Sequence, residues 1–261
     1  MCKDCGCSGH HHEHRDHNHD HGVGHAHTHT RPDGTTYTHI HDSAEAREIT
    51  LGSAILAAND QLAAENRGWF RARRLAVYNL ISSPGSGKTT LLVKLLNKLN
   101  AENIKSAVIV GDQYGDIDAE RMRATGCKIT QIETRSSCHL DASRVQNVLE
   151  DAVPEDTEIL FIENVGNLVC PVAFDLGERA KIALLSTAEG EEKPLKYPAL
   201  FAAAELVLLT KCDLAAALEW NYDLAVKNIK QVNPDAQIMR ISAKTEEGLD
   251  KLTEFFKQQI K

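Results

Sequence analysis

The stretch Ser82-Ser-Pro-Gly-Ser-Gly-Lys-Thr-Thr90 decides the fold that this sequence predicts. It follows a short apolar run, Leu75–Ile81, which we expect to be a buried strand, and it leads into a helical pattern over Thr89–Asn100. A glycine-rich turn between a strand and a helix lets backbone N–H groups converge on phosphate oxygens, and the helix N-terminus adds a favourable dipole. The stretch therefore predicts a phosphate-binding loop.

The side chains of this loop have expected roles in binding a nucleotide. Lys88 should reach the β- and γ-phosphates, and the Thr89 hydroxyl should bind Mg²⁺. Ser82 stands where the full pattern has its first glycine, so a Gly/Ser-rich turn without a ligand is the alternative. The residues expected to contact the phosphates or Mg²⁺ are Gly85, Ser86, Gly87, Lys88, Thr89 and Thr90.

Apolar runs alternate with helical patterns on both sides of the loop. An amphipathic helix is expected from Ser43 to about Asn66. The later strands expected are Ser106–Val110, Lys128–Ile132, Glu158–Ile162, Ile182–Ser186, Glu205–Thr210 and Gln237–Ile241. The later helices expected are Asp118–Thr125, Asp141–Ala152, Leu214–Val232 and Gly248–Ile260. This alternation indicates an α/β fold with a mostly parallel sheet flanked by helices, the class of the P-loop NTPases.

The N-terminal segment has a different composition. Of the 13 histidines in the chain, 12 lie between His10 and His41, interleaved with acids and preceded by a cluster of cysteines. The segment has almost no aliphatic side chains, so nothing offsets the entropy cost of ordering it. We therefore expect residues 1–42 to be a disordered metal-binding tail and residues 43–261 to form the folded domain. An expression tag is the alternative, although tags are usually uninterrupted histidine runs.

Composition excludes several classes of protein. The chain has 261 residues with 29 Lys and Arg against 37 Asp and Glu, a net charge of -8, which argues against binding nucleic acid. No apolar run is long enough to span a membrane, and no signal peptide is visible. Seven cysteines, an odd number, fit a reducing compartment, so we expect a cytoplasmic protein.

Two segments near the C-terminus predict recognition of guanine. Thr210-Lys-Cys-Asp213 ends a predicted strand, where α/β sheets place their ligands. The Asp213 carboxylate can accept hydrogen bonds from guanine N1–H and from its 2-amino group, which adenine lacks, and the stem of Lys211 can stack on the base. Ser242 and Ala243 follow the next strand and form the second expected base-contacting loop. The nucleotide expected is therefore GTP.

Acidic residues at two other strand ends are candidates for catalysis. Asp112 and Glu163 are expected to position Mg²⁺ and the attacking water, and Gly166 to sense the γ-phosphate through its backbone amide. Lys88, Asp112 and Glu163 form the expected catalytic set, and Gly166 is expected to bind the nucleotide. Acids at strand ends also serve as helix caps or solvated loop residues, and that alternative stays open.

A second candidate site lies within the folded domain. Cys138 and His139 are adjacent, and Cys170 follows the Gly166 loop, so the three side chains can meet near the γ-phosphate. Two thiolates and an imidazole suit Zn²⁺ or Ni²⁺. Spacing alone favours the alternative that these residues only pack in the core. Cys127 and Cys212 are interpreted as packing residues.

Taken together, these motifs resemble those of the HypB/UreG family of P-loop metallochaperone GTPases, over nearly the whole chain. The resemblance implies a slow GTPase that stores nickel and delivers it during maturation of a nickel enzyme, [NiFe]-hydrogenase above all. It implies a nucleotide- and metal-dependent homodimer with a Ni²⁺ or Zn²⁺ site from Cys138, His139 and Cys170 at the subunit interface. The implied partners are a nickel-handling accessory protein and the hydrogenase large subunit.

The resemblance also implies a separate, tighter nickel site at Cys2, Cys5 and Cys7. Two other functions stay open at this stage. One is a metal-storage protein whose phosphate loop is incidental, and the other is an ATP-dependent kinase with a metal-binding tail. Asp213 argues against the kinase. We also expect the GTP-bound and GDP-bound forms to differ in metal affinity at Cys138 and Cys170, because both residues lie near segments that respond to the γ-phosphate.

Overall fold

A computed structural model describes residues 26–30, 36–40, 44–113 and 115–260 of the chain, with side chains from Ser53 onward apart from that gap. The chain divides into two units, Met1–Ser53 and Ala54–Lys261, which are described separately. Cys2, Cys5 and Cys7 and the histidines before residue 26 lie outside the described residues.

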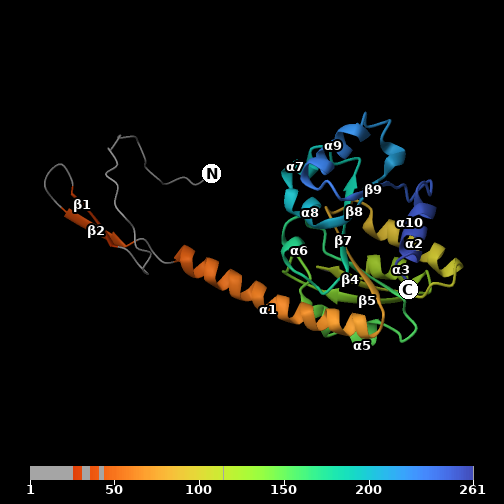
Figure 1. Cartoon of the computed structure of the whole chain (residues 1–261), viewed down its shortest axis with the longest axis horizontal. Coiled ribbons are helices and arrows are strands. Elements are labelled where there is room, and N and C mark those ends of the chain that lie inside the picture. Colours follow the sequence, from red (N-terminus) through yellow and green to blue (C-terminus); the bar gives the residue numbers. More distant parts are fainter. Residues whose placement is uncertain (1–25, 31–35, 41–43, 114, 261) are drawn as a thin grey trace. The chain divides into compact units, whose positions relative to one another are not determined.

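The larger unit is built on a seven-stranded sheet (Figure 1). The spatial order is β5-β4-β6-β3-β7-β8-β9, and all neighbouring strands pair in parallel. The strands are β3 Ala76–Ser82, β4 Ser106–Asp112, β5 Lys128–Glu133, β6 Ile159–Glu163, β7 Ala180–Ser186, β8 Ala204–Thr210 and β9 Gln237–Arg240. Each agrees with a predicted strand to within two residues at either end, and the parallel α/β class is confirmed.

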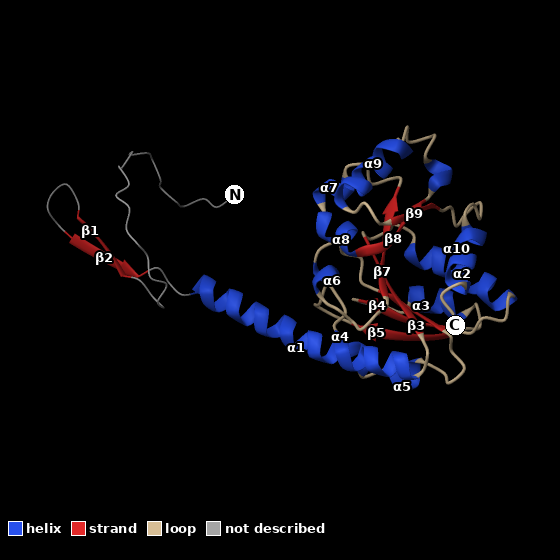
Figure 2. Ribbon diagram, in the orientation of Figure 1, coloured by secondary structure: helices blue, strands red, loops and turns tan. Residues whose placement is uncertain are grey.

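Helices cover both faces of this sheet (Figure 2). One face packs against α2 Lys88–Ala101, α3 Ile117–Arg123 and α10 Leu249–Lys257. The other packs against the C-terminal part of α1 (Ala44–Ala72), which carries Phe70, and against α4 Ala142–Gln146, α5 Leu149–Ala152, α8 Pro198–Ala203 and α9 Tyr222–Val232. The short helices α6 Cys170–Ala173 and α7 Lys193–Lys196 and the 3-10 turn η1 Cys212–Leu214 complete the described elements of this unit.

The alternation of side chains along β3 shows why both faces are covered. Tyr78 points into the core under α2 and α10, where its ring lies 4.9 Å from that of Phe256, centroid to centroid. Val77 points to the opposite face and packs with Phe70 of α1. Successive side chains of a strand face opposite ways, so a strand apolar on both faces needs helices on both sides.

Four predicted helices differ from the observed ones by three residues or more. The helix predicted over Gly248–Ile260 ends at Lys257. The helix predicted to end near Asn66 continues to Ala72, because Phe70 is buried in the core. The helix predicted over Asp141–Ala152 is divided into α4 and α5. The helix predicted from Leu214 begins at Tyr222, where the Asn221 side chain accepts the Leu224 N–H at 3.0 Å and caps the first turn.

The smaller unit contains two antiparallel strands, β1 Ala26–Thr30 and β2 Thr36–Ile40. These ten residues belong to the segment 1–42, for which the sequence predicts a metal-binding tail, and the rest of that segment lies outside the described residues. The strands are rich in threonine, with Tyr37 and Ile40 in β2, and β-branched and aromatic side chains favour extended backbone. None of the helices in the described part of the chain combines the length and hydropathy that crossing a bilayer requires.

Candidate functional site

The phosphate loop joins β3 to α2 at the carboxyl edge of the sheet. Gly87 precedes the helix with φ of 99°, a left-handed conformation that favours glycine, and α2 begins at Lys88. Ser82 ends β3, where no left-handed backbone is needed, so its replacement of the usual glycine carries no strain. Its hydroxyl instead accepts a hydrogen bond from Lys88 Nζ at 2.8 Å and contacts Ser86 Oγ.

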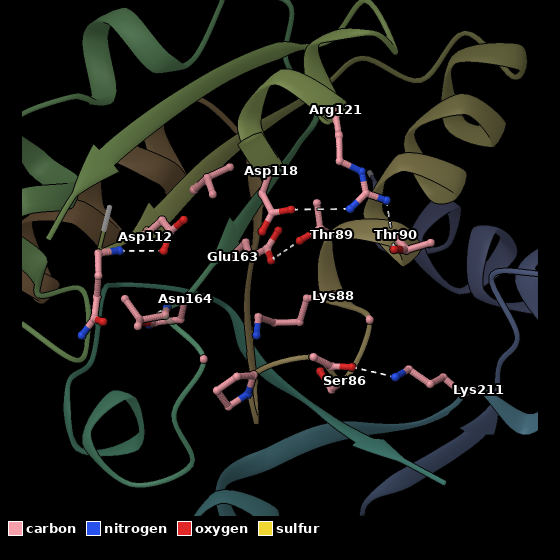
Figure 3. A pocket seen from close by; sticks show the side chains of 18 residues that line it. Ser86, Lys88, Thr89, Thr90, Asp112, Asp118, Arg121, Glu163, Asn164 and Lys211 are labelled. Atoms are coloured by element: carbon pink, nitrogen blue, oxygen red, sulfur yellow. Dashed lines mark hydrogen bonds and ion pairs between the residues drawn. The ribbon is translucent and has the colours of Figure 1, made fainter. Parts of the chain in front are cut away.

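Oxygen ligands for a cation lie at one end of this loop (Figure 3). The Thr89 hydroxyl donates to Glu163 Oε1 at 2.9 Å, and Glu163 Oε2 is buried with no hydrogen-bond partner among the described residues. Asp112 and Asp118 line the same cavity of about 480 Å³. Hydroxyl and carboxylate oxygens are the ligands that Mg²⁺ prefers, and the unpartnered oxygen of Glu163 fits a metal-bound water. The residues present therefore fit Mg²⁺.

Burial changes the pKa of two charged side chains in this cavity, Lys88 and Glu163. Loss of contact with water raises the pKa of Glu163 to about 7, although the Lys88 ammonium and the Thr89 hydroxyl bond act in the opposite direction. Burial also lowers the pKa of Lys88, while Glu163 and other nearby acids raise it. Both side chains would regain favourable charge interactions with a bound Mg²⁺–phosphate group.

A second cavity of about 330 Å³ adjoins the first, and its wall includes Lys211, Asp213 and Ala243. Ser86, Gly87, Thr90 and Lys211 line both cavities, which places the expected base site beside the expected phosphate site. Ser242 does not line the cavity. It is fully buried, and its hydroxyl donates to Asp213 Oδ1 at 2.6 Å, so it orients the acid that would recognise guanine.

Thr210 replaces the asparagine that guanine-binding motifs usually carry, and it keeps a structural link to the phosphate loop. Its hydroxyl donates to the Ser86 carbonyl at 2.7 Å. Lys211 Nζ donates to the Gly85 carbonyl, also at 2.7 Å. The strand-end turn and the phosphate loop are therefore held together before a nucleotide binds.

The side chains of Cys138, His139 and Cys170 lie close together in the fold, although Cys138 and Cys170 are 32 residues apart in sequence. The ligand atoms of Cys138, His139 and Cys170 are all within 4.8 Å of one another, and the three side chains are half-buried. Cys170 begins α6, and a hydrogen bond with its thiol is the main reason why the pKa of Cys138 is raised. The His139 ring stacks on Phe174, with centroids 3.9 Å apart. This group is suited to a soft divalent metal.

Comparison with known proteins identifies the family. The CobW/HypB/UreG nucleotide-binding domain matches residues 76–240, which include every loop of the two cavities up to β9. The chain belongs to the CobW/HypB/UreG family.

The HypB branch supplies close relatives. The hydrogenase maturation factor HypB of Azotobacter chroococcum mcd 1 is 49% identical over 216 residues, which are 83% of this chain and 70% of that protein. HypB of Escherichia coli K12 is 47% identical over 217 residues, 83% and 74% of the two chains. The crystal structure of Helicobacter pylori HypB in complex with nickel has a TM-score of 0.73 at 35% identity, covering 77% of this chain and 94% of that one.

Several residues of this CobW/HypB/UreG domain were not predicted from sequence. Arg121 of α3 lines the phosphate cavity, where its guanidinium lies 3.6 Å from Asp118 and donates to the Thr90 hydroxyl at 3.3 Å. Asn164 and Phe174 also contact the sites. The position of Asn164 directly after Glu163 was the one available signal. Of the two cysteines interpreted as packing residues, Cys212 is buried and Cys127 is half-buried, and neither joins the metal group.

Proposed function

We propose that this protein is a GTP-hydrolysing nickel metallochaperone that stores nickel and delivers it during maturation of [NiFe]-hydrogenase. The observation that carries the proposal is the juxtaposition of a guanine-type acid, a phosphate loop and a Cys–His–Cys group in one domain. The relatives are named hydrogenase maturation factors, and this supports a hydrogenase as the enzyme that receives the nickel.

In the proposed hydrolysis, the residues of the two cavities bind the nucleotide, hold Mg²⁺ and orient the attacking water. Lys88 leaves the Ser82 hydroxyl and binds the β- and γ-phosphates, while Asp213 accepts two hydrogen bonds from guanine. Thr89 and Glu163 would hold Mg²⁺, which offsets the negative charge of the phosphates. Asp112 and Glu163 orient the attacking water, and the Gly166 amide senses the γ-phosphate. Without an external activator, turnover is slow.

The proposed cargo is Ni²⁺ or Zn²⁺ at Cys138, His139 and Cys170. The HypB crystal structure that contains nickel supports the first of these metals. We place this site at the interface of a homodimer that forms with nucleotide and metal, and we expect a cytoplasmic protein that meets a nickel-handling accessory protein and the hydrogenase large subunit. Residues 1–42 serve as the storage tail, with Cys2, Cys5 and Cys7 as its tight site, and residues 43–261 as the GTPase domain.

The Lys88→Ala variant tests the enzymatic part of the proposal. It should lose GTP turnover by a factor of at least about 10³, because phosphoryl transfer depends on charge stabilisation, while its thermal unfolding stays close to that of the parent. Phosphate release from GTP and from ATP is the measurement. Equal turnover of ATP and GTP by the parent would contradict the assignment of the nucleotide.

The Asp213→Asn variant tests the assignment of the base. An asparagine side chain can donate to the 2-oxo group of xanthine but cannot accept both guanine hydrogen bonds, so the preference should shift from GTP to xanthosine triphosphate. Competition between the two nucleotides for the variant and the parent gives the ratio of affinities. If the variant kept the full preference of the parent for GTP, Asp213 would not be the base-recognition residue.

A further inference from the structure

Asn164 occupies a buried position between the two candidate sites. Its side chain is 1% exposed, and it follows Glu163 directly in the wall of the phosphate cavity (Figure 3). Its side-chain oxygen Oδ1 accepts hydrogen bonds from two backbone groups, the Val165 N–H at 3.0 Å and the Leu140 N–H at 3.1 Å. Leu140 is the residue that follows His139. The Asn164 side-chain oxygen therefore joins the loop over residues 163–166 to the segment that carries Cys138 and His139.

The orientation of the Asn164 amide is set by a second pair of side chains. Its Nδ2 donates to Asn79 Oδ1 at 3.2 Å, and Asn79 Nδ2 donates to Glu178 Oε1 at 3.1 Å. The other oxygen of Glu178 accepts the Leu176 N–H at 2.7 Å, in the segment that follows α6 and Cys170. This chain of hydrogen bonds therefore starts at Leu140, next to His139, and ends at Leu176, in the segment that follows Cys170 and α6.

Packing around Asn164 leaves little room for independent movement of the two loops. Gly166 lies against the phosphate loop, where an added Cβ would be 2.9 Å from the Pro84 Cα. The Leu140 side chain lies against Gly111, where an added Cβ would be 2.6 Å from the Leu140 Cγ. Gly166 is therefore closely packed against the phosphate loop and Leu140 against the end of β4, and the Asn164 side chain is the hydrogen-bonded link between these two packed positions.

We propose that Asn164 is the positioning residue through which the nucleotide state sets the geometry of the Cys138–His139–Cys170 site. The inference rests on the proposed function, because it requires both ligands. When the γ-phosphate draws Gly166 toward it, the side-chain carbonyl of Asn164 moves as well. Because this carbonyl is hydrogen-bonded to the Leu140 N–H, Leu140 and the adjacent His139 move with it. Linkage then requires that metal alters nucleotide affinity by the same factor.

The test uses the full chain with Cys2, Cys5 and Cys7 replaced by serine, so that thiolate-to-nickel absorption reports Cys138 and Cys170. Ni²⁺ affinity is measured by chelator competition with GDP and with a non-hydrolysable GTP analogue. In this parent we expect the two affinities to differ by about fivefold or more. In Asn164→Ala the ratio should fall to near one, and the absorption band should become the same in both nucleotide states.

Asn66→Ala is the matched control. Asn66 is as buried as Asn164, and it donates to the carbonyls of Ala142, at the start of α4, and of Leu176, after α6, but it has no hydrogen bond to Glu163 or Gly166. The Asn66→Ala variant should be less stable than the parent but should keep the parent's ratio of Ni²⁺ affinities between the two nucleotide states. Asn164→Ser, which keeps a hydroxyl near Val165 N–H but is too short for Leu140, replaces the alanine variant if that variant does not fold.

Two results would overturn the inference and can be told apart from failure of the proposed function. A ratio in the Asn164 variants equal to that of the parent would show that the coupling does not pass through this side chain. A parent that hydrolyses GTP and binds Ni²⁺ with equal affinity in both nucleotide states would leave the proposed function intact and remove the coupling. A parent that does not turn over GTP would instead reject the proposed function.

Discussion

Glu163 shows how a single buried residue makes stability depend on pH. Burial raises the pKa of its carboxyl from an ordinary 4.5 to about 7 in the nucleotide-free protein. The folded chain therefore holds a proton that the unfolded chain has already released at pH 5 to 7. This contribution to the free energy of unfolding is fully present below pH 4.5 and is lost as the pH rises through 7.

At this residue, the Glu163→Gln variant should remove that pH dependence. Glutamine can still accept the Thr89 hydrogen bond but cannot ionise. Between pH 5 and 8, without Mg²⁺, the variant should lose less unfolding free energy than the parent, by on the order of 3 kcal/mol at about 1.4 kcal/mol per pKa unit. Urea unfolding at each pH is the measurement, and Glu155→Gln, an exposed acid, is the control. The same pH slope in parent and variant would contradict the raised pKa.

At the scale of elements, the start of α10 links core packing to the base site. Gly248 precedes the helix with φ of 78°, and a Cβ there would lie 2.1 Å from the Arg240 carbonyl oxygen. The loop before it holds Ser242, whose N–H donates to the Glu247 carbonyl at 3.0 Å and whose hydroxyl orients Asp213. The way in which α10 begins therefore also determines the position of the guanine-recognition acid.

For this element, Gly248→Ala should destabilise the protein more than Gly190→Ala. Both glycines have a positive φ, but only Gly248 is surrounded closely by other atoms. Gly190 has φ of 82°, and apart from its chain neighbours no described residue has an atom within 4 Å of an added Cβ, so Gly190→Ala should cost only the left-handed strain, roughly 1–2 kcal/mol. Gly248→Ala adds a clash with backbone and should cost about 1–3 kcal/mol more, with weaker GTP binding. Thermal unfolding and nucleotide titration of both variants are the measurements. Equal losses would mean that the loop adapts to the added methyl group.

At the scale of the whole molecule, we expect two kinds of nickel binding in the tail. Cys2, Cys5 and Cys7 offer three thiolates within six residues, which suit one tightly held Ni²⁺, whereas the histidines from His10 to His41 offer many interchangeable imidazoles. Imidazole binds metal only when neutral, with an ordinary pKa near ~6.5, so the weaker nickel should be released as the pH falls toward 5.

For the whole chain, replacing the three tail cysteines by serine should remove one tight Ni²⁺ and leave the acid-labile binding. Metal analysis after dialysis at pH 7.5 and at pH 5 separates the two classes. A matched chain with the tail histidines replaced by asparagine should show the opposite pattern. If tight binding survived without the cysteines and disappeared without the histidines, the two assignments would have to be exchanged.

The sequence by itself determined those features that depend on neighbouring residues. The phosphate loop with its flanking strand and helix, the Thr210–Asp213 turn and the strands of the sheet follow from local patterns, because backbone conformation and side-chain alternation are set within a few residues. The strand order was decided by tertiary structure alone. Since β6 lies between β4 and β3, the loop after Glu163 meets both the phosphate loop and the segment around Leu140. Spacing along the chain could not show this, nor that Cys138 meets Cys170 or that the Ser242 hydroxyl donates to Asp213. These features depend on which surfaces are buried together, and a hydrogen bond such as that of Asn164 to Leu140 forms only after the sheet has brought the two loops to one edge.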